Sequence, residues 1–338
     1  MITYPKLKKG AAIGVTAPSS GVPAPLNEVI KQACSQMEQR GFTVVCGETS
    51  WTQDKAKSAP ALIRAAEFNS MMGNSAIDII IPPWGGELLI EILEHIDFEN
   101  INKKWVLGYS DVSVLLLAIT LKTGIATAHG TNLVDLRGEL MDETTAMWES
   151  VLATNSGEAI IQHSSEHYQK EWQHSNPSPC VFHLTEKTVW KVVGNQPVKI
   201  QGRLLGGCID IIRHLIGTPF GDVDAFRKKH INGEPVIWYL ENCEMNTADL
   251  RRSLVQMKLA GWFENCSGLM FGRSEANKPV ENYTVEDVYQ DLADELKIPV
   301  IYDIDCGHLP PQITFINGAF AEVEVSEGNG VVNQIFRT

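Results

Sequence analysis

The sequence predicts an α/β protein in two parts: an N-terminal domain built on a flavodoxin-like parallel sheet, and a smaller C-terminal domain of mixed α/β structure. First, short unbroken apolar runs alternate with helical segments through the first half, which is typical of a parallel sheet covered on both faces. Second, this alternation stops at Thr154 and resumes near Trp190. Third, the chain has 338 residues, more than a single hydrophobic core usually holds.

The predicted strands of the first half end at glycine, proline or polar residues, and the segments between them carry apolar residues at helical spacing. We expect these strands at 11–17, 42–46, 77–81, 104–108 and 125–129. We expect the helices at 26–40, 58–72, from Glu87 onward, 111–122 and 141–153. Because ligands of parallel sheets bind beyond the carboxyl ends of the strands, the residues that follow each strand are the first candidates for function.

Serine, proline and charged residues replace the periodic pattern from Thr154 to Lys187. We therefore expect an N-terminal domain at 1–155, a connecting substrate loop at 156–189 and a C-terminal domain at 190–338, since loops of this length are usually functional or disordered. In the last part, Gly202–Gly207 leads into a helix at 208–216. Further strands are expected at 235–240, 267–272 and 299–305, helices at 248–260 and 284–296, and an antiparallel pair after Phe315.

Composition restricts the partners and the compartment. The net charge of −13 argues against a nucleic-acid polymer or an anionic membrane surface, although a small anionic ligand could still bind in a local pocket. No apolar run approaches membrane-spanning length, and the N-terminus lacks the apolar core of a signal peptide. The seven cysteines include no Cys-x-x-Cys pair, so we expect reduced thiols in a cytoplasmic protein.

Two segments are candidate binding motifs, one for a metal ion and one for a dinucleotide, and neither has the surrounding sequence that such a site needs. His163-Ser-Ser-Glu-His167 matches the His-x-x-Glu-His form of some zinc peptidases, but it lies in a serine-rich segment without helical periodicity. The first strand ends in Thr-Ala-Pro-Ser-Ser-Gly, which lacks the glycine spacing of dinucleotide-binding turns. We therefore predict no metal and no cofactor.

Three polar residues lie just past the C-terminal ends of predicted buried strands: Ser110, Glu241 and His308. Ser110 lies at a strand-to-helix turn, Gly108-Tyr109-Ser110, where its hydroxyl would be exposed near free helix N–H groups. The α/β-hydrolases place their nucleophile this way in Gly-x-Ser-x-Gly, although the second glycine is missing here. A serine nucleophile needs a base, and the base needs a carboxylate, so these residues could supply all three roles. The alternative is that Ser110 only caps the helix.

Seven segments resemble, in order, the pattern of the LD-carboxypeptidase family of serine peptidases. They cover nearly the whole chain: Pro82-Pro-Trp-Gly-Gly86, Leu107-Gly-Tyr-Ser-Asp-Val-Ser113, Gly202-Arg-Leu-Leu-Gly-Gly207, Leu240-Glu-Asn-Cys-Glu244 with the helix 250–261, Gly307-His308, and Asn317-Gly318. The family includes murein tetrapeptide carboxypeptidases and microcin C immunity proteins.

The resemblance implies a role for each of the three strand-end residues. Ser110 would be the nucleophile, His308 the general base and then acid, and Glu241 the carboxylate that orients the imidazole. Glu244 is the rival carboxylate, but Glu241 directly follows the strand and matches the family's Leu-Glu pair. Ser110 would attack an amide carbonyl to form an acyl-enzyme, which water then hydrolyses.

The resemblance also implies an oxyanion hole made by the backbone N–H of Asp111 and an N–H of the Gly85-Gly86 turn. Glycine suits this turn because the backbone can approach the substrate without a Cβ, although a plain tight turn is the alternative. Glu87 stands where the family often has a small polar or aromatic residue, and His129-Gly-Thr-Asn replaces the more common His-Gly-Pro. Both differences lie on the substrate side.

The long segment 154–190 resembles the immunity-protein branch, in which a loop tryptophan stacks on a nucleobase. Trp172 and Trp190 are the candidates, with a core position as the alternative for Trp190, and Trp84 would line the pocket beside the oxyanion turn. We therefore favour a hydrolase of peptidyl or aminoacyl amide conjugates, and the family resemblance implies a homodimer. Murein tetrapeptide cleavage is the second possibility, and a two-lobed ligand-binding protein without chemistry is the third.

Overall fold

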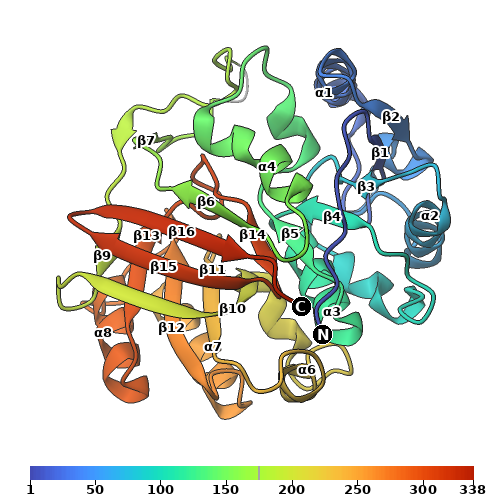
Figure 1. Cartoon of the computed structure of the whole chain (residues 1–338). Helices are drawn as coiled ribbons and strands as arrows, with labels where there is room; N and C mark the ends of the chain where they lie inside the picture. The colour runs from blue at the N-terminus through green and yellow to red at the C-terminus, as the bar shows by residue number, and fades with distance from the viewer. Residues whose placement is uncertain (174–175) are drawn as a thin grey trace.

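The computed structural model of the protein describes residues 1–173 and 176–338, so residues 174–175 of the predicted connecting loop lie outside the described part. Figure 1 shows two lobes side by side, with the blue and cyan N-terminal half on the right and the orange and red C-terminal half mainly on the left. Each lobe is organised around its own sheet. In the part that the structure describes, no helix is both long enough and apolar enough to span a bilayer.

The N-terminal sheet has the flavodoxin-like order that the sequence predicts. Its six strands are arranged β14-β5-β4-β3-β1-β2, so that the first five strands of the chain follow the order 2-1-3-4-5 and pair in parallel. The strands are β1 (Ala12–Val15), β2 (Thr43–Cys46), β3 (Ile79–Ile80), β4 (Trp105–Gly108), β5 (Thr127–His129) and β14 (Phe315–Asn317). β14 comes from the C-terminal half and pairs antiparallel with β5.

Helices cover both faces of this sheet. They are α1 (Asn27–Gln39), α2 (Ala61–Gly73), α3 (Val112–Thr123) and α4 (Glu143–Ala153), with 3-10 segments η1 (Ala24–Leu26), η2 (Glu48–Trp51), η3 (Leu89–His95) and η4 (Leu133–Leu136). The helix expected from Glu87 is the 3-10 segment η3 instead, and its first N–H, that of Leu89, donates to Asp111 Oδ2 at 2.8 Å. α3 is buried on all sides from Val112 to Leu121, because it lies inside a core that contains residues of both halves.

The second sheet is mixed and has eight strands, in agreement with the mixed α/β structure expected for the C-terminal domain. β10 to β13 run parallel, and the flanking strands pair antiparallel. In spatial order the strands are β6 (Ala159–His163), β16 (Asn329–Ile335), β15 (Phe320–Ser326), β10 (Val198–Cys208), β11 (Val236–Glu241), β12 (Cys266–Gly272), β13 (Val300–Ile304) and β9 (Lys191–Val192). The expected antiparallel pair after Phe315 corresponds to β15 and β16.

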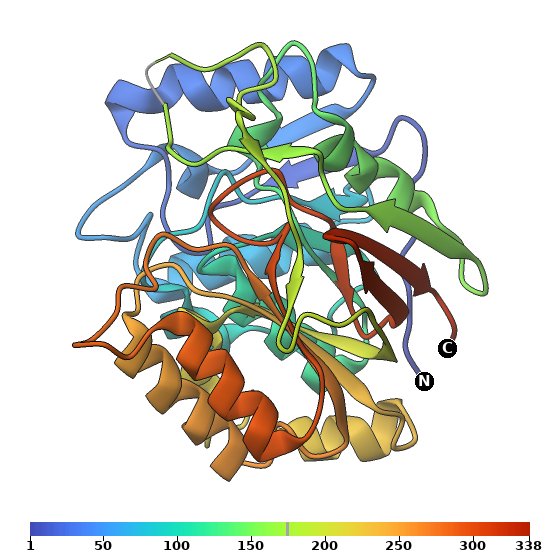
Figure 2. The ribbon, with the colours of Figure 1, turned by 90° about the vertical axis from the view of Figure 1, so that its left-hand side faces the viewer.

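The remaining helices belong to the C-terminal half: α5 (Ile209–Ile212), η5 (Arg213–Leu215), α6 (Val223–His230), α7 (Thr247–Leu259) and α8 (Val285–Leu296). Figure 2 shows α7 and α8 together on the outer face of the second sheet, at the opposite end of the molecule from α1. Thr284 begins α8 with a capping box to Asp287, as a threonine before an acidic first turn predicts.

The two halves exchange strands across the segment that the sequence predicts to be a loop. Residues 156–189 contain β6, which pairs with β16 in the second sheet, and a small ribbon of β7 (His167–Tyr168) and β8 (Glu186–Lys187). β14 crosses in the other direction to β5. The C-terminal half therefore contributes one strand to the first sheet, and the connecting segment contributes one strand to the second.

Candidate active site

Ser110 occupies a strained turn between β4 and α3. Its backbone has φ +64°, a left-handed conformation that is uncommon for residues other than glycine and that often marks functional sites. β4 is fully buried, and the Ser113 N–H donates to the Ser110 carbonyl at 2.9 Å, which closes the turn. Asp111, and not Ser110, is the N-cap residue of α3, and no side chain caps the helix. The capping role considered for Ser110 therefore does not match the geometry.

The structure brings Ser110, His308 and Glu241 together in one hydrogen-bonded series. Ser110 Oγ lies 3.0 Å from His308 Nε2, and His308 Nδ1 lies 2.9 Å from Glu241 Oε2. The His308 side chain is 27% exposed, whereas that of Glu241 is 0% exposed. Glu244, the rival carboxylate, lines a different cavity, and its backbone N–H donates to Asp210 Oδ1 at 3.0 Å.

Central strands hold the carboxylate and the imidazole in place. Glu241 is the last residue of β11, between β10 and β12. His308 follows β13 through Gly307, which has φ +97° and lies so close to Glu241 that an added Cβ would be 2.6 Å from Oε2. Arg273 donates from Nη2 to Asp305 at 2.8 Å and to the Leu309 carbonyl at 3.2 Å. These contacts fix the loop that carries His308.

The Glu241 carboxylate sets the charge of the imidazole. Burial lowers the pKa of His308, but the negative charge of Glu241, with a smaller contribution from the Cys243 thiol, outweighs it, so the pKa of His308 lies well above 6.5. Burial raises the pKa of Glu241, and the positive charge of His308 more than compensates, so this pKa lies below 4.5. His308 must therefore lose a proton before it can accept one from Ser110.

A neutral histidine lies behind this pair. Burial lowers the pKa of His129 to about 4, although the Glu241 carboxylate opposes the shift. His129 is 0% exposed at the end of β5, and its ring lies 5.4 Å from that of Tyr239 and 6.5 Å from that of Tyr109. His129 is therefore neutral at pH 7, and Glu241 is the carboxylate that faces His308.

The Gly85-Gly86 turn passes directly against Ser110. A Cβ on Gly85 would lie 2.6 Å from Ser110 Cβ and 3.1 Å from the Asp111 backbone nitrogen. Gly86 has φ +144°, and a Cβ there would lie 2.3 Å from Ser20 Oγ. Both positions therefore require glycine, and the turn lies against the backbone nitrogen of Asp111, whose N–H the family resemblance implies in an oxyanion hole.

A cavity of about 410 Å³ opens beside the Ser110 hydroxyl. Trp84, the tryptophan that the sequence places beside the oxyanion turn, is among its lining residues. The others are Ser20, Gly21, Pro23, Gln53, Gly85, Gly86, Tyr109, Ser110, Asn132 and His308. Sequence reasoning missed Asn132, whose side chain accepts a bond from the Tyr109 N–H at 3.3 Å. Its position just past β5 was the signal that could have identified it.

The two loop tryptophans have different environments. Trp172 is half-buried, donates from Nε1 to the His308 carbonyl at 2.8 Å, and packs 5.6 Å from Phe182. Trp190 is 1% exposed in the second core and donates to the buried carboxylate of Asp305 at 2.8 Å. The substrate contact predicted for Trp190 is therefore wrong, because its ring is covered and its N–H is already satisfied inside the protein. The core position is the alternative that the structure supports.

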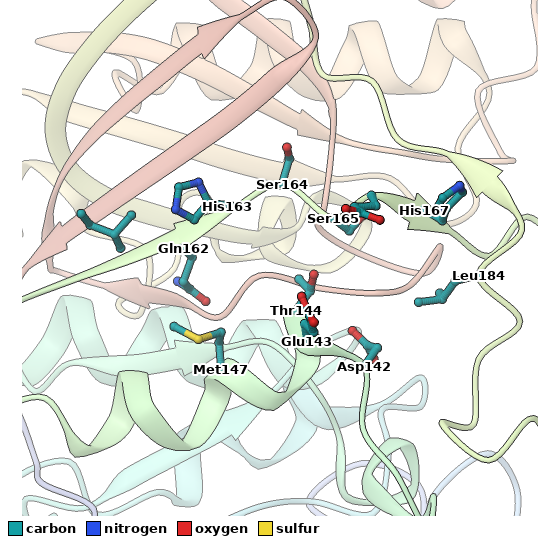
Figure 3. A pocket seen from close by; sticks show the side chains of 12 residues that line it. Asp142, Glu143, Thr144, Met147, Gln162, His163, Ser164, Ser165, His167 and Leu184 are labelled. Carbon is teal, nitrogen blue, oxygen red and sulfur yellow. The ribbon is translucent and has the colours of Figure 1, made fainter.

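The His163-x-x-Glu-His167 segment forms no helix. His163 ends β6 and His167 begins β7, and Figure 3 shows their rings at separate positions along the segment. Both line a cavity of about 420 Å³ that includes Asp142. Within residues 1–173 and 176–338, no group of three or more histidine, cysteine, aspartate or glutamate side chains is arranged to hold a metal ion.

Comparisons with known proteins agree with the resemblance read from the sequence. The chain is 25% identical to the microcin C7 self-immunity protein MccF of Escherichia coli, over 97% of this chain and 95% of that protein. It is 26% identical to a probable murein peptide carboxypeptidase of Bacillus subtilis, over 96% of this chain and 92% of that protein. A solved structure of MccF in complex with glutamyl sulfamoyl guanosine has the same fold, with a TM-score of 0.84 at 20% identity over 100% of both chains.

Two family models match separate halves of the chain. One, described as the LD-carboxypeptidase N-terminal domain, matches residues 13–130, and the other, described as the LD-carboxypeptidase C-terminal domain, matches residues 201–323. The first includes the Ser110 turn, and the second includes Glu241 and His308. The chain therefore belongs to the LD-carboxypeptidase family of serine peptidases.

Proposed function

We propose that Ser110, His308 and Glu241 form the catalytic triad of a serine carboxypeptidase that cleaves amide bonds in peptidyl or aminoacyl conjugates, such as aminoacyl-nucleotides of the microcin C type. The observation that carries the proposal is the hydrogen-bonded series from Ser110 Oγ through His308 to Glu241, at 3.0 and 2.9 Å. It begins at a strained serine beside a cavity large enough for a small ligand.

Each group has one chemical task. Neutral His308 accepts the Ser110 proton as Oγ attacks the amide carbonyl carbon, and Glu241 stabilises the imidazolium that forms. His308 then donates that proton to the departing amine as the C–N bond breaks and an acyl-enzyme remains. A water, deprotonated by His308, releases the acid. The Asp111 N–H and the Gly85-Gly86 turn would stabilise the oxyanion, and one such donor typically lowers the barrier by about 3 kcal/mol.

Aromatic side chains near Ser110 and His308 favour a leaving group that contains a flat ring. Trp84 lines the Ser110 cavity, and Trp172 is tied to the His308 carbonyl. A tryptophan stacked on a nucleobase contributes about 1–3 kcal/mol. MccF, the relative of similar length, has been solved with an aminoacyl sulfamoyl nucleoside bound, so we assign conjugates of this class as the first substrates to test.

A substrate panel tests the proposal. Aminoacyl sulfamoyl adenosines and murein tetrapeptides are incubated with the wild-type protein and with the Ser110→Ala variant, and products are followed by chromatography. We expect cleavage of the aminoacyl conjugates by the wild type alone. Cleavage of the tetrapeptides alone would instead support the murein activity suggested by the Bacillus subtilis relative. If ligands bind equally to both proteins and neither turns over, the two-lobed binding protein replaces the hydrolase.

We also propose that the protein works in the cytoplasm as a homodimer. All seven cysteines are free thiols in the structure, which suits a reducing compartment. Light scattering coupled to size exclusion should give twice the chain mass of 37.4 kDa, and cell fractionation tests the location. A monomeric mass, or recovery outside the cytoplasmic fraction, would reject the corresponding statement.

A further inference from the structure

A second cavity, of about 820 Å³, lies on the other side of the Ser110 turn. The Ser110 cavity is lined by Gly86 and Ser110, and the second cavity is lined by the next residue of each segment, Glu87 and Asp111. The linings of the two cavities are therefore neighbours along the chain in two segments, at Gly86-Glu87 and at Ser110-Asp111. The second cavity comes within one residue of the Ser110 nucleophile along the chain.

Carboxylates dominate the lining of the second cavity. It is lined by Glu87, Asp111, Asp210, Glu244 and Asp249, together with Leu88, Ile90, Ile211, Arg213, His214 and Met245. Asp210 is already engaged, because its two oxygens accept the N–H groups of Cys243 and Glu244 at 2.8 and 3.0 Å. Asp249 is paired at the rim with Arg252 at 2.6 Å.

Glu87 and Glu244 have no cation of their own. Within residues 1–173 and 176–338, neither forms a salt bridge within 4.0 Å, although both line the cavity. Partial burial raises the pKa of Glu87, and the negative charges of Glu244 and Asp111 raise it further. Neighbouring carboxylates that face one space without a counter-ion raise the pKa of each other in this way.

A buried oxygen provides an independent sign of a missing partner. Asp111 is 1% exposed, and its Oδ2 accepts bonds from the Leu89 N–H at 2.8 Å and from the Ser19 hydroxyl. Its Oδ1 is buried and has no hydrogen-bond partner in the described part of the chain. Because a buried carboxylate oxygen left unpaired is costly, a donor that enters this cavity would be stabilised there.

The two basic side chains in the lining do not satisfy these acids. Arg213 donates from Nε to the Asp210 carbonyl at 3.1 Å and from Nη1 to Ser253 Oγ at 2.9 Å. Burial lowers the pKa of His214, and the nearby Arg213 charge lowers it further, so His214 is mainly neutral at pH 7. The cavity therefore keeps a net negative charge that favours a cation.

From this arrangement we propose that the cavity lined by Glu87, Glu244 and Asp111 binds an ammonium group carried by the acyl part of the substrate. The inference rests on the proposed function, because it assigns the two ends of one amide substrate. The acyl amino acid carries the ammonium and would occupy the acidic cavity. The leaving nucleotide is anionic, so the carboxylates of the acidic cavity would repel it. It would lie in the Ser110 cavity, which Trp84 lines.

The ammonium can be the α-amine or a side-chain amine, and matched substrates distinguish these sources. Alanyl and lactyl conjugates of sulfamoyl adenosine differ by an α-amine against an α-hydroxyl. Lysyl and norleucyl conjugates differ by a side-chain amine. We expect the wild type to prefer the cationic member of at least one pair in kcat/KM. We expect Glu87→Gln and Glu244→Gln each to reduce that preference about tenfold, as for loss of one charged hydrogen-bond partner.

Glu94→Gln is the matched control, because Glu94 lies on η3, is 75% exposed and does not line the cavity. It should keep the wild-type preference. The same pairs are then measured for binding to Ser110→Ala by calorimetry, with and without Glu87→Gln. The inference would be overturned if the wild type had the same kcat/KM for both members of each pair. It would also be overturned if both glutamine variants kept the wild-type ratio of kcat/KM within a pair. Cation-selective binding without turnover in any protein would remove the proposed function and keep the ammonium site.

Discussion

Replacing Glu241 with glutamine removes the charge that faces His308 and leaves the shape of the side chain almost unchanged. Glu241 is fully buried, so no water can take over the role of the carboxylate. In the proposed reaction the imidazole becomes positively charged as Ser110 attacks, and the carboxylate stabilises that charge. Glu241→Gln should therefore slow acylation much more than it weakens substrate binding.

The geometry sets the size of the effect. Two unit charges separated by the 2.9 Å between Nδ1 and Oε2 interact by about 6 kcal/mol at an effective dielectric constant of about 20. Since each 1.36 kcal/mol corresponds to a factor of ten in rate, this energy limits the loss to roughly 10⁴-fold. We expect kcat/KM to fall by about 10³- to 10⁴-fold, with little change in KM.

The same variant should change the dependence of activity on pH. In the wild type the Glu241 carboxylate holds the pKa of His308 well above 6.5, so kcat/KM should increase as pH rises through that pKa and the imidazole becomes neutral. Without the carboxylate, burial lowers the pKa of His308, and only the smaller contribution of Cys243 opposes it. The residual activity of Glu241→Gln should therefore reach its plateau at lower pH.

The assay is kcat/KM for an aminoacyl sulfamoyl adenosine from pH 5 to 10. Glu244→Gln serves as the comparison for the rival carboxylate, and its midpoint should stay at the wild-type pH. A loss below about tenfold in Glu241→Gln, or a midpoint that shifts only in Glu244→Gln, would refute the assignment of the orienting carboxylate.

Three further predictions follow from the surrounding structure. Gly85→Ala places a Cβ 2.6 Å from Ser110 Cβ and should reduce kcat about 100-fold, while the circular dichroism spectrum stays native. Turnover close to that of the wild type would show that this turn is not part of the oxyanion hole. Trp172→Ala should raise the KM for nucleotide conjugates about tenfold and leave that for small peptide amides alone; an equal effect on both would argue against base stacking. Arg273→Met leaves the 0% exposed Asp305 carboxylate without its cation, so urea denaturation should show a loss of about 3–5 kcal/mol; unchanged stability would contradict the importance of this ion pair.

The parallel strands could be predicted because their signal is local. β1, β4 and β11 are unbroken apolar runs that end at glycine or a polar residue, and a buried parallel strand has no other common pattern. The helix at α8 was equally clear from Thr284 and Asp287, which form its capping box. The alternation of strands and helices predicted the parallel sheet, whose strand order is the flavodoxin-like 2-1-3-4-5.

Pairing between distant segments could not be predicted from local pattern. β14 is three residues long and lies in a C-terminal tail, yet it completes the N-terminal sheet beside β5. β6 lies at the start of a polar, serine-rich segment, and only its pairing with β16 makes it a strand. Trp190 could face a ligand or the core, because nothing in its own segment shows that its N–H donates to Asp305.

In the candidate site, too, the individual residues could be predicted from local sequence, whereas their contacts could not. Ser110, Glu241 and His308 were each identifiable as polar residues after buried strands, and the family resemblance then grouped them. Their hydrogen bonds join three elements that lie far apart in the sequence, so only the fold reveals the 3.0 and 2.9 Å contacts. The left-handed backbone of Ser110 was also hidden, because strain depends on what surrounds a turn.

Covalent labelling of the protein with a fluorophosphonate, read by intact mass and peptide mapping, tests the activated serine most directly. We expect one adduct per wild-type chain, located on Ser110. Ser110→Ala should carry none, and His308→Ala, although folded, should react far more slowly because the hydroxyl has lost its base. No adduct on the wild type, or equal labelling of wild type and Ser110→Ala, would contradict a nucleophile at this turn.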